Sequence, residues 1–198
     1  MNTTINPPAA SGPQEPHLHG DLAIWFFILA ELLAFGVFFI AYAVTRAYNV
    51  EAFNAAQAGL DRNIGALNTI VLISGSWCVV RSVQAARADL LKPATRWMGA
   101  GLLCGVAFLV AKLFEYQAKL AVGVSMDTDT FHMFYFSLTF FHFMHVVLGV
   151  CILAILLLKL RRGGYGSHDV HGLETGAAYW HMVDLAWIVL FPLVYVMH

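Results

Sequence analysis

Charge is what this chain has least of. Only 12% of its 198 residues are charged and 60% are hydrophobic, whereas an average soluble domain carries about 25% charged residues. Eleven basic and twelve acidic residues leave a net charge of −1, so the excess of Lys and Arg that marks a nucleic-acid-binding domain is missing. We therefore expect a membrane protein that has no nucleic-acid partner.

Cysteine is also scarce. Cys78, Cys104 and Cys151 are the three cysteines of the chain, and they lie far apart within apolar runs. No CxxC spacing is present, so neither a disulfide framework nor a thiolate metal site is expected.

Basic residues are missing from the N-terminus. The first twenty residues contain four prolines and no Lys or Arg, whereas a secretory signal begins with a basic region. We predict a flexible tail over residues 1–20, followed by one transmembrane domain over residues 21–198.

Long apolar segments are what the chain has in abundance. We predict five membrane-spanning helices, over residues 22–45, 64–85, 97–122, 131–158 and 177–197. Each segment is long enough, at about 1.5 Å per residue, to cross a hydrocarbon core of about 30 Å. Continuous runs of this length are typical of helices rather than of barrel strands, so the expected fold class is all-α, an integral membrane bundle.

The basic residues of the connections predict the orientation. If the N-terminus is inside, the inner side receives Arg81, Arg87, Lys92, Arg96, Lys159, Arg161 and Arg162, and the outer side receives Arg46, Arg62 and Lys119. The side with more Lys and Arg is normally cytoplasmic. We therefore expect the N-terminus inside and the C-terminus outside. Gly101 and Gly105 form one GxxxG motif, which indicates a close helix contact.

Seven ionisable side chains lie within the predicted spans: Glu31, Lys112, Glu115, His142, His145, His181 and Asp184. Charged groups are costly to bury in a membrane, so each is a functional candidate. Counting the helical rise places His142 near the depth of Glu31, and His145 near the depth of Asp184. We expect carboxylates of the first and last spans to face the histidines of the fourth.

The remaining polar candidates have simpler explanations. Lys112 and Glu115, three residues apart, are expected to neutralise each other, and Lys112 would also be placed to reach a lipid phosphate. Arg81 lies at the inner end of its span, where a long side chain reaches the interface.

Several interpretations of the buried cluster compete. A haem would need axial histidines that face each other from different helices, and only His181 lies opposite His142 and His145. A carboxylate-bridged di-metal site would need a Glu-x-x-His motif, which is absent. The groups would otherwise hydrogen-bond to one another and fix the helix register, or Glu31 would hold a transferable proton as part of a relay.

Four motifs, in the same order, resemble one known family. They are residues 25–42 (WFFILAELLAFGVFFIAY), 113–116 (LFEY), 135–149 (YFSLTFFHFMHVVLG) and 171–195 (HGLETGAAYWHMVDLAWIVLFPLVY). They resemble the haem-copper oxidase subunit III family in its five-helix form, and the resemblance covers residues 20–197.

The resemblance implies an accessory subunit of a respiratory complex in the bacterial plasma membrane. Such a subunit binds no haem, copper or other metal, contacts the catalytic subunit that carries them, holds phospholipid and supports proton uptake. Glu31 corresponds to the carbodiimide-reactive buried carboxylate of the family, and Glu115 to the acid of its Glu-Tyr pair. Glu174, His181 and Asp184 correspond to the closing signature. Contact candidates for lipid or a partner subunit are Lys112, Glu115, Glu174 and Arg81.

Two large rings favour one branch of the family. Phe140 and Phe143 stand where the respiratory-oxidase versions have small glycines, and the five-helix length and the ILAEL opening (residues 28–32) look more like the NorE-like members associated with nitric oxide reductase. A cytochrome oxidase is the alternative partner complex. The alternatives from other classes are a membrane haem-b or quinol-oxidising cytochrome that uses the intramembrane histidines, and a small channel or carrier that uses Glu31.

Overall fold

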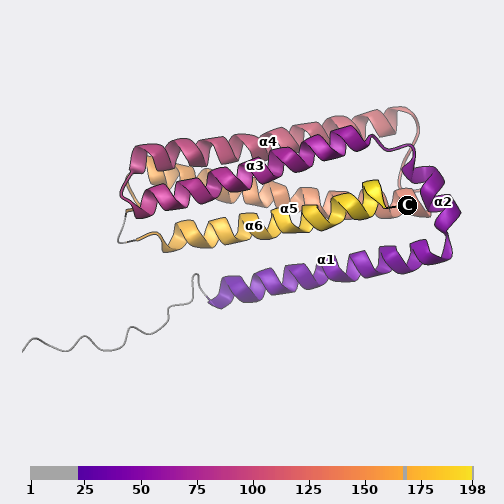
Figure 1. Cartoon of the computed structure of the whole chain (residues 1–198), viewed down its shortest axis with the longest axis horizontal. Helices are drawn as coiled ribbons and strands as arrows, with labels where there is room; N and C mark the ends of the chain where they lie inside the picture. Colours follow the sequence, from indigo (N-terminus) through magenta and orange to yellow (C-terminus); the bar gives the residue numbers. More distant parts are fainter. Residues whose placement is uncertain (1–21, 167–168, 198) are drawn as a thin grey trace, which may run out of the picture.

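The computed structural model describes residues 22–166 and 169–197, and its long elements are helices (Figure 1). They are α1 (Leu22–Tyr48), α2 (Val50–Gln57), α3 (Arg62–Arg87), α4 (Leu91–Ala121), α5 (Thr130–Arg161), α6 (His171–Phe191) and the π-helix η1 (Pro192–Val196). Five of the helical segments are long and apolar enough to cross a membrane. The predicted all-α fold with five spans is confirmed, and the predicted tail over residues 1–20 lies outside the described residues.

The helices extend beyond the apolar runs that predicted them. α4 begins at Leu91 rather than at residue 97, and α6 begins at His171 rather than at residue 177. Pro93 lies in the first turn of α4, where the missing N–H costs no helical hydrogen bond. The polar first turn of α6 contains Glu174, and an acidic residue there interacts favourably with the helix dipole. The edge of an apolar run therefore does not mark the end of the helix.

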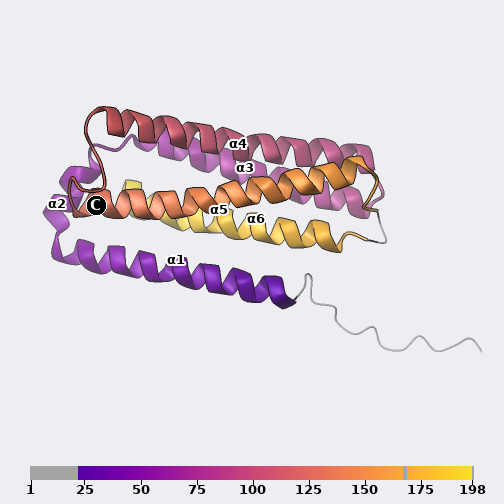
Figure 2. The same ribbon diagram turned by 180° about the vertical axis from the view of Figure 1, so that it is seen from behind.

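The long helices lie side by side and alternate in direction (Figures 1 and 2). α3, α4, α5 and α6 form one group, and α1 runs along its side, joined to α3 by the short α2 at one end. The buried residues of α1 are Ile28, Phe35 and Tyr42, which recur every seven residues and so form one stripe. Ring contacts join this stripe to α5, with centroids 4.9 Å apart for Phe35 and Phe141 and 5.8 Å apart for Tyr42 and Phe134.

The GxxxG motif lies at a close helix contact, as the sequence predicted. A Cβ atom at Gly101 would lie 2.9 Å from Cγ2 of Val79 on α3, and one at Gly105 would lie 2.7 Å from the Trp180 ring on α6. Both distances are too short for a real Cβ, so α4 packs here only because these positions lack a side chain.

Aspartates cap the N-termini of α3 and α5. The Asp61 carboxylate accepts from the backbone N–H groups of Asn63 and Ile64, at 2.9 and 3.3 Å. The Asp129 carboxylate accepts from the backbone N–H of His132 and contacts the His132 ring, both at 2.8 Å. A side-chain oxygen in this position satisfies N–H groups that have no partner within the helix.

The Asp129 cap is expected to weaken in acid. Partial burial alone would raise the pKa of the Asp129 carboxyl, but the hydrogen bonds and charge of His132 outweigh it and hold the pKa below its ordinary value. The stabilisation is therefore complete above pH about 4 and is lost as the pH falls through the lowered pKa. Asp129→Asn keeps a good cap and should remove this acid dependence, which is worth less than about 1 kcal/mol because the carboxylate is solvent-screened. Melting temperatures of both proteins between pH 7 and pH 3 would measure it, and equal pH profiles would contradict it.

Candidate functional site

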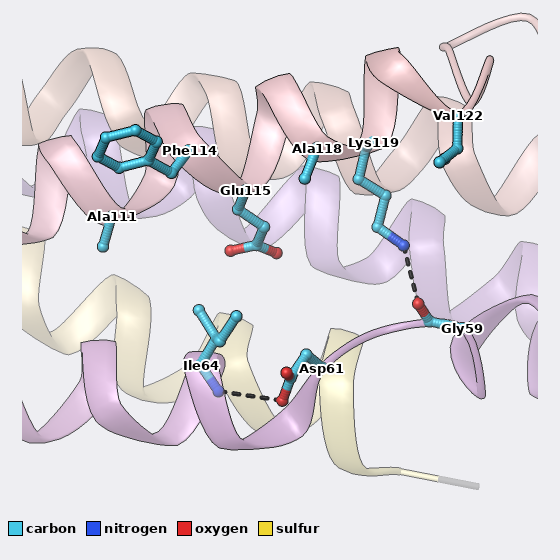
Figure 3. A pocket seen from close by; sticks show the side chains of 9 residues that line it. All are labelled: Gly59, Asp61, Ile64, Ala111, Phe114, Glu115, Ala118, Lys119 and Val122. Atoms are coloured by element: carbon cyan, nitrogen blue, oxygen red, sulfur yellow. Dashed lines mark hydrogen bonds between the residues drawn. The ribbon is translucent and has the colours of Figure 1, made fainter.

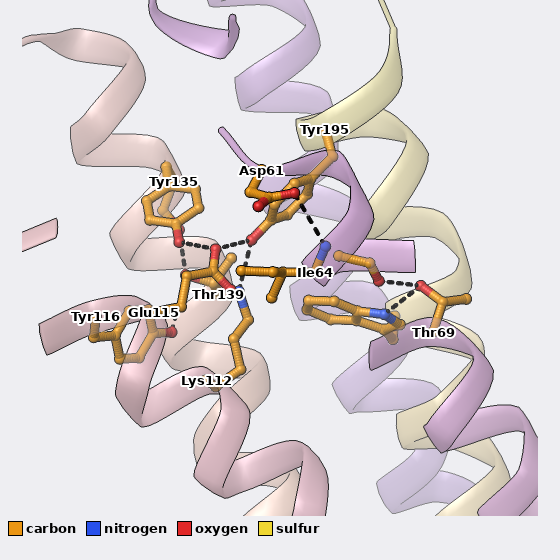
Figure 4. Close-up of polar contacts among 11 residues, drawn as sticks. Asp61, Ile64, Thr69, Lys112, Glu115, Tyr116, Tyr135, Thr139 and Tyr195 are labelled. Carbon is orange, nitrogen blue, oxygen red and sulfur yellow. Dashed lines mark hydrogen bonds and ion pairs between the residues drawn. The ribbon is translucent and has the colours of Figure 1, made fainter. Parts of the chain in front are cut away.

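A buried polar cluster surrounds Glu115 of α4 (Figure 4). The Lys112 ammonium donates to Glu115 Oε2 at 3.0 Å and to the Tyr195 hydroxyl at 2.7 Å. The hydroxyls of Tyr135 and Tyr195 each donate to Glu115 Oε1 at 2.6 Å. The expected Lys112–Glu115 ion pair is present. The suggested contact of Lys112 with a lipid phosphate is wrong, because the residue is 0% exposed and its ammonium points into the protein.

Aromatic rings enclose the Lys112 ammonium. It lies 5.1–5.6 Å from the ring centroids of Tyr116, Tyr135, Trp187 and Tyr195, within the range of cation–π attraction. A buried charge is tolerated only when it is paired and hydrogen-bonded, and this ammonium has a carboxylate, a hydroxyl and several ring faces around it. The rings come from α4, α5, α6 and η1, so the cluster joins the three C-terminal spans.

The π-helix η1 positions Tyr195. Pro192 begins this segment, and the backbone N–H of Met197 donates to the carbonyl of Pro192 at 2.9 Å, a bond across five residues. Gln57 of α2 donates from Nε2 to the carbonyl of Val194 at 2.7 Å and so ties the wide turn to α2. Segments of π-helix are frequent at functional sites. The sequence predicted a helix to residue 197, and Pro192 was the one signal that its last turn would differ.

A second set of hydrogen bonds joins α4 to α5 beside this cluster. The Tyr116 hydroxyl donates to Thr139 Oγ1 at 3.0 Å, and the Thr139 hydroxyl donates to the carbonyl of Tyr135 at 2.6 Å. Thr139 has no exposed surface, so this link is internal. The sequence reasoning missed Tyr135, Thr139 and Tyr195, because uncharged hydroxyls within a span attract little attention.

Glu31 and His145 form a pair between α1 and α5. Glu31 Oε2 lies 2.8 Å from His145 Nε2, and His145 Nδ1 lies 2.7 Å from the carbonyl oxygen of Phe141. A carbonyl only accepts, so Nδ1 carries a hydrogen, and the contact between Nε2 and Oε2 then needs one further proton. That proton is shared by an imidazole and a carboxyl group, which is an arrangement able to hold and transfer a proton.

The depth estimate assigned the wrong histidine to Glu31. His142, the expected partner, lies one turn away on α5, and neither of its ring nitrogens has a hydrogen-bond partner within the described residues. Its ring is 0% exposed, and the rings of Phe35, Phe108 and Trp187 lie around it, with centroids at 6.2, 5.6 and 5.0 Å. The estimate was wrong by about 5 Å, the rise of one turn, because it treated the helix ends as level.

Asp184 faces α3 and not the histidines of α5. Its carboxyl is hydrogen-bonded to Ser76, and the Ser76 hydroxyl lies 3.2 Å from Nδ1 of His181. The expected facing of Asp184 and His145 is therefore wrong. His181 and Asp184 are three residues apart on one face of α6, and that face packs on α3, a direction that helical depth alone does not specify.

Two further candidates lie at the other end of the bundle. The guanidinium of Arg87 forms an ion pair with Glu174 at 2.7 Å, which joins α3 to α6. The guanidinium of Arg81 lies 5.8 Å from the ring centroid of Trp97. A role for Glu174 and Arg81 in contacting lipid or a partner stays a prediction.

Two of the intramembrane histidines, His142 and His145, are poorly placed to bind a metal or haem. Over residues 22–166 and 169–197, no group of three or more His, Cys, Asp or Glu is placed to hold a metal ion. Both nitrogens of His145 are already hydrogen-bonded, and rings enclose His142. An axial haem ligand needs a free nitrogen that faces an open space, so the geometry does not favour His142 or His145 as such a ligand.

A groove opens over Glu115 on the outside of the bundle (Figure 3). It has a volume of about 500 Å³ and lies between the start of α3 and the end of α4. Its lining residues are Gly59, Asp61, Ile64, Ala111, Phe114, Glu115, Ala118, Lys119 and Val122. Lys119 donates to the carbonyl of Gly59 at 2.9 Å across its end. Glu115 therefore connects the buried cluster to a surface groove.

Comparison with known proteins agrees with the arrangement of spans and motifs. The family model for cytochrome c oxidase subunit III matches residues 18–198. Cytochrome c oxidase subunit 3 of Synechocystis sp. is 31% identical over 201 residues, which cover 100% of this chain and 84% of that protein. The subunit 3 of Thermostichus vulcanus is 29% identical over 185 residues, covering 91% of this chain and 90% of that protein.

A third relative is a fused protein. The haem-copper oxidase subunit I+III of Aeropyrum pernix is 30% identical over 179 residues, covering 87% of this chain and 22% of that protein. The match of the family model over nearly the whole chain confirms the resemblance inferred from the motifs: the chain is a multi-pass membrane protein and belongs to the cytochrome c oxidase subunit III family.

Proposed function

We propose that the chain is an accessory subunit that binds the catalytic subunit of a haem-copper respiratory complex in a bacterial plasma membrane. The observation that carries this proposal is the family match over residues 18–198. The fused subunit I+III of Aeropyrum pernix supports the partner, because in that protein the two subunit types share one polypeptide. Haem and metal then belong to the partner, and this chain supports assembly and proton uptake.

The exposed side of α1 is the surface we assign to partner subunits and lipid. α1 has few buried residues, and its outward residues include the exposed Phe26, Leu33 and Ile40. The N-terminus is taken to lie inside, as the distribution of basic residues predicts. A reporter enzyme fused to the C-terminus and assayed for periplasmic activity tests this orientation.

The partner complex is proposed to be of the nitric oxide reductase type, with a cytochrome oxidase as the alternative. Phe140 and Phe143 support this choice, because their rings are stacked with centroids 6.4 Å apart and Phe140 is exposed. Large rings on this face of α5 keep a neighbouring helix farther away than glycines would. Mass spectrometry of the subunits that co-purify with the chain tests the branch: nitric oxide reductase subunits support it, and oxidase subunits overturn it.

The Glu31–His145 pair is proposed to hold a proton for uptake by the complex. Glu31→Gln keeps a hydrogen-bonding side chain beside His145, so folding stability should change by less than about 1 kcal/mol. Turnover of the complex should fall by up to about tenfold, which corresponds to about 1.4 kcal/mol. The measurement is steady-state turnover of the purified complex. Glu51→Gln, an exposed acid on α2, is the control, and unchanged turnover in Glu31→Gln would remove the relay.

A further inference from the structure

A basic pocket lies at the end of the bundle where α4 begins and α5 ends (left in Figure 1). It has a volume of about 380 Å³, and its lining residues are Leu91, Lys92, Thr95, Arg96, Leu160, Arg161 and Gly163. Three of these seven residues are cations, and none of the seven is an acid. The pocket is therefore positively charged and offers no carboxylate to balance that charge.

The cations of the basic pocket lack partners, unlike other cations at this end of the bundle. Arg87 is paired with Glu174 at 2.7 Å, and the Lys159 ammonium lies 4.0 Å from the ring centroid of Tyr165. The three cations that line the pocket are exposed, and their side chains form no hydrogen bond, ion pair or ring contact with residues 22–166 or 169–197. Like charges held close together repel one another, so an anion among them would be stabilised by all three.

Two helices supply the positive charges, so an anion would be held between them. Lys92 and Arg96, four residues apart, lie on one face of α4, and Arg161 comes from the last turn of α5. A guanidinium group donates two parallel hydrogen bonds to one carboxylate or phosphate group, whereas an ammonium group acts as a point charge. Each of the two arginines can therefore bind its own carboxylate.

The shape of the basic pocket distinguishes it from a lipid groove. Its lining is confined to residues 91–96 of α4 and to residues 160–163 at the end of α5, which lie outside the apolar runs 97–122 and 131–158. The groove over Glu115, in contrast, follows α4 over residues 111–122. An acyl chain needs a trough along the apolar part of a helix, and the lining of the basic pocket does not extend there. The pocket therefore fits an anionic group that carries no acyl chain.

We propose that the basic pocket binds an acidic segment of the partner subunit, with Asp or Glu carboxylates on Arg96 and Arg161 and a further carboxylate beside Lys92. The inference rests on the proposed function for the existence of that subunit, and it adds the place and the charge of one contact. An isolated surface ion pair contributes little, but bidentate arginine pairs and networks of several charges contribute more. Complementary charges also determine the register of an interface.

Carbodiimide cross-linking of the native complex tests the contact. A water-soluble carbodiimide joins an amine to a touching carboxylate as an amide, and the water that is lost converts the reagent to a urea. We expect mass spectrometry of the digested complex to find a peptide with Lys92 linked to an Asp or Glu of the partner subunit. Lys92→Gln should remove this product. A complex in which Lys92 is linked to no peptide of the partner overturns the proposal.

Paired arginine variants measure the strength of the contact. Arg96→Gln with Arg161→Gln should raise the dissociation constant of the partner subunit about five- to thirtyfold, measured by diluting the complex and recovering the tagged chain. Arg162→Gln is the matched control, because Arg162 is an exposed neighbour that does not line the pocket, and it should change the constant by less than about twofold.

The outcomes separate this pocket from the proposed function. Equal losses of affinity in the double variant and in Arg162→Gln would indicate a general effect of charge and overturn the proposal. A double variant that keeps its affinity for the partner but loses a bound phospholipid in native mass spectrometry would assign the pocket to a lipid head group, which also overturns it. Either result leaves the proposed function standing, whereas a chain that purifies with no partner subunit overturns the proposed function itself.

Discussion

Replacing Glu115 with alanine is expected to lower the free energy of unfolding by about 3–5 kcal/mol. The substitution leaves the Lys112 ammonium without its carboxylate in a site with no exposed surface. It also removes the acceptor of the Tyr135 and Tyr195 hydroxyls. A buried charge without a partner costs more than the ion pair contributes. Unfolding of the purified protein in mixed detergent and denaturant, followed by circular dichroism, measures the change.

A double variant is the control for this charge argument. Lys112→Met with Glu115→Gln removes both charges and keeps an acceptor for the two tyrosines. It should recover most of the stability that Glu115→Ala loses, because replacing both members of a buried pair is often close to neutral. A double variant as unstable as Glu115→Ala would show that the charge of Lys112 is not the cause, and a stable Glu115→Ala would contradict the cluster itself.

The close packing of α4 against α6 gives the second large expected effect. Gly105→Leu should lower the free energy of unfolding by about 1–3 kcal/mol or prevent folding, which is the usual cost of overpacking a core. A Cβ atom at this position would meet the Trp180 ring at 2.7 Å and Val150 Cγ2 at 2.8 Å. Trp180 is itself fully buried, so its ring has no free space to move into.

Gly99→Leu on the same helix is the matched control. A Cβ atom at Gly99 meets nothing within 4 Å, and leucine has a higher helix propensity than glycine. We expect Gly99→Leu to be as stable as the unsubstituted protein or slightly more stable in the same unfolding measurement. Equal losses in the two variants would mean that the helix contact at Gly105 is not what the substitution disturbs.

The sequence predicted the parts of the structure that depend on local spacing. The five spans follow from run length, and the Lys112–Glu115 pair follows from residues three positions apart on one helix. The close contact at Gly101 and Gly105 follows from the GxxxG motif. These features need no knowledge of how the helices are placed relative to one another.

The sequence did not predict the partners that depend on helix placement. Glu31 meets His145 rather than His142, because the heights and tilts of α1 and α5 decide which turn it faces. Asp184 meets Ser76, because the rotation of α6 directs it to α3. Tyr195 reaches Glu115 through a π-helical turn, which has no periodic signature. Each of these partners requires the packing of whole helices.

The observed contacts also narrow the competing interpretations of the polar groups. Most of them join spans: Glu31 with His145 links α1 to α5, His181 with Ser76 links α6 to α3, and the Glu115 cluster links α4, α5 and η1. Hydrogen bonds between spans fix the relative positions of the helices. The Glu31–His145 pair combines such a link with a proton shared by an imidazole and a carboxyl group, which is why the proton-uptake proposal rests on it.

The most direct test of the proposed accessory role is to measure where the haem resides. The chain, tagged and purified from its native membranes, is predicted to bring down a larger subunit together with a haem Soret band. Separation of the two subunits by stronger detergent should leave the whole Soret absorbance with the larger subunit. A Soret band that stays with this chain in proportion to its amount, or a chain that purifies without any haem-bearing subunit, would contradict the account.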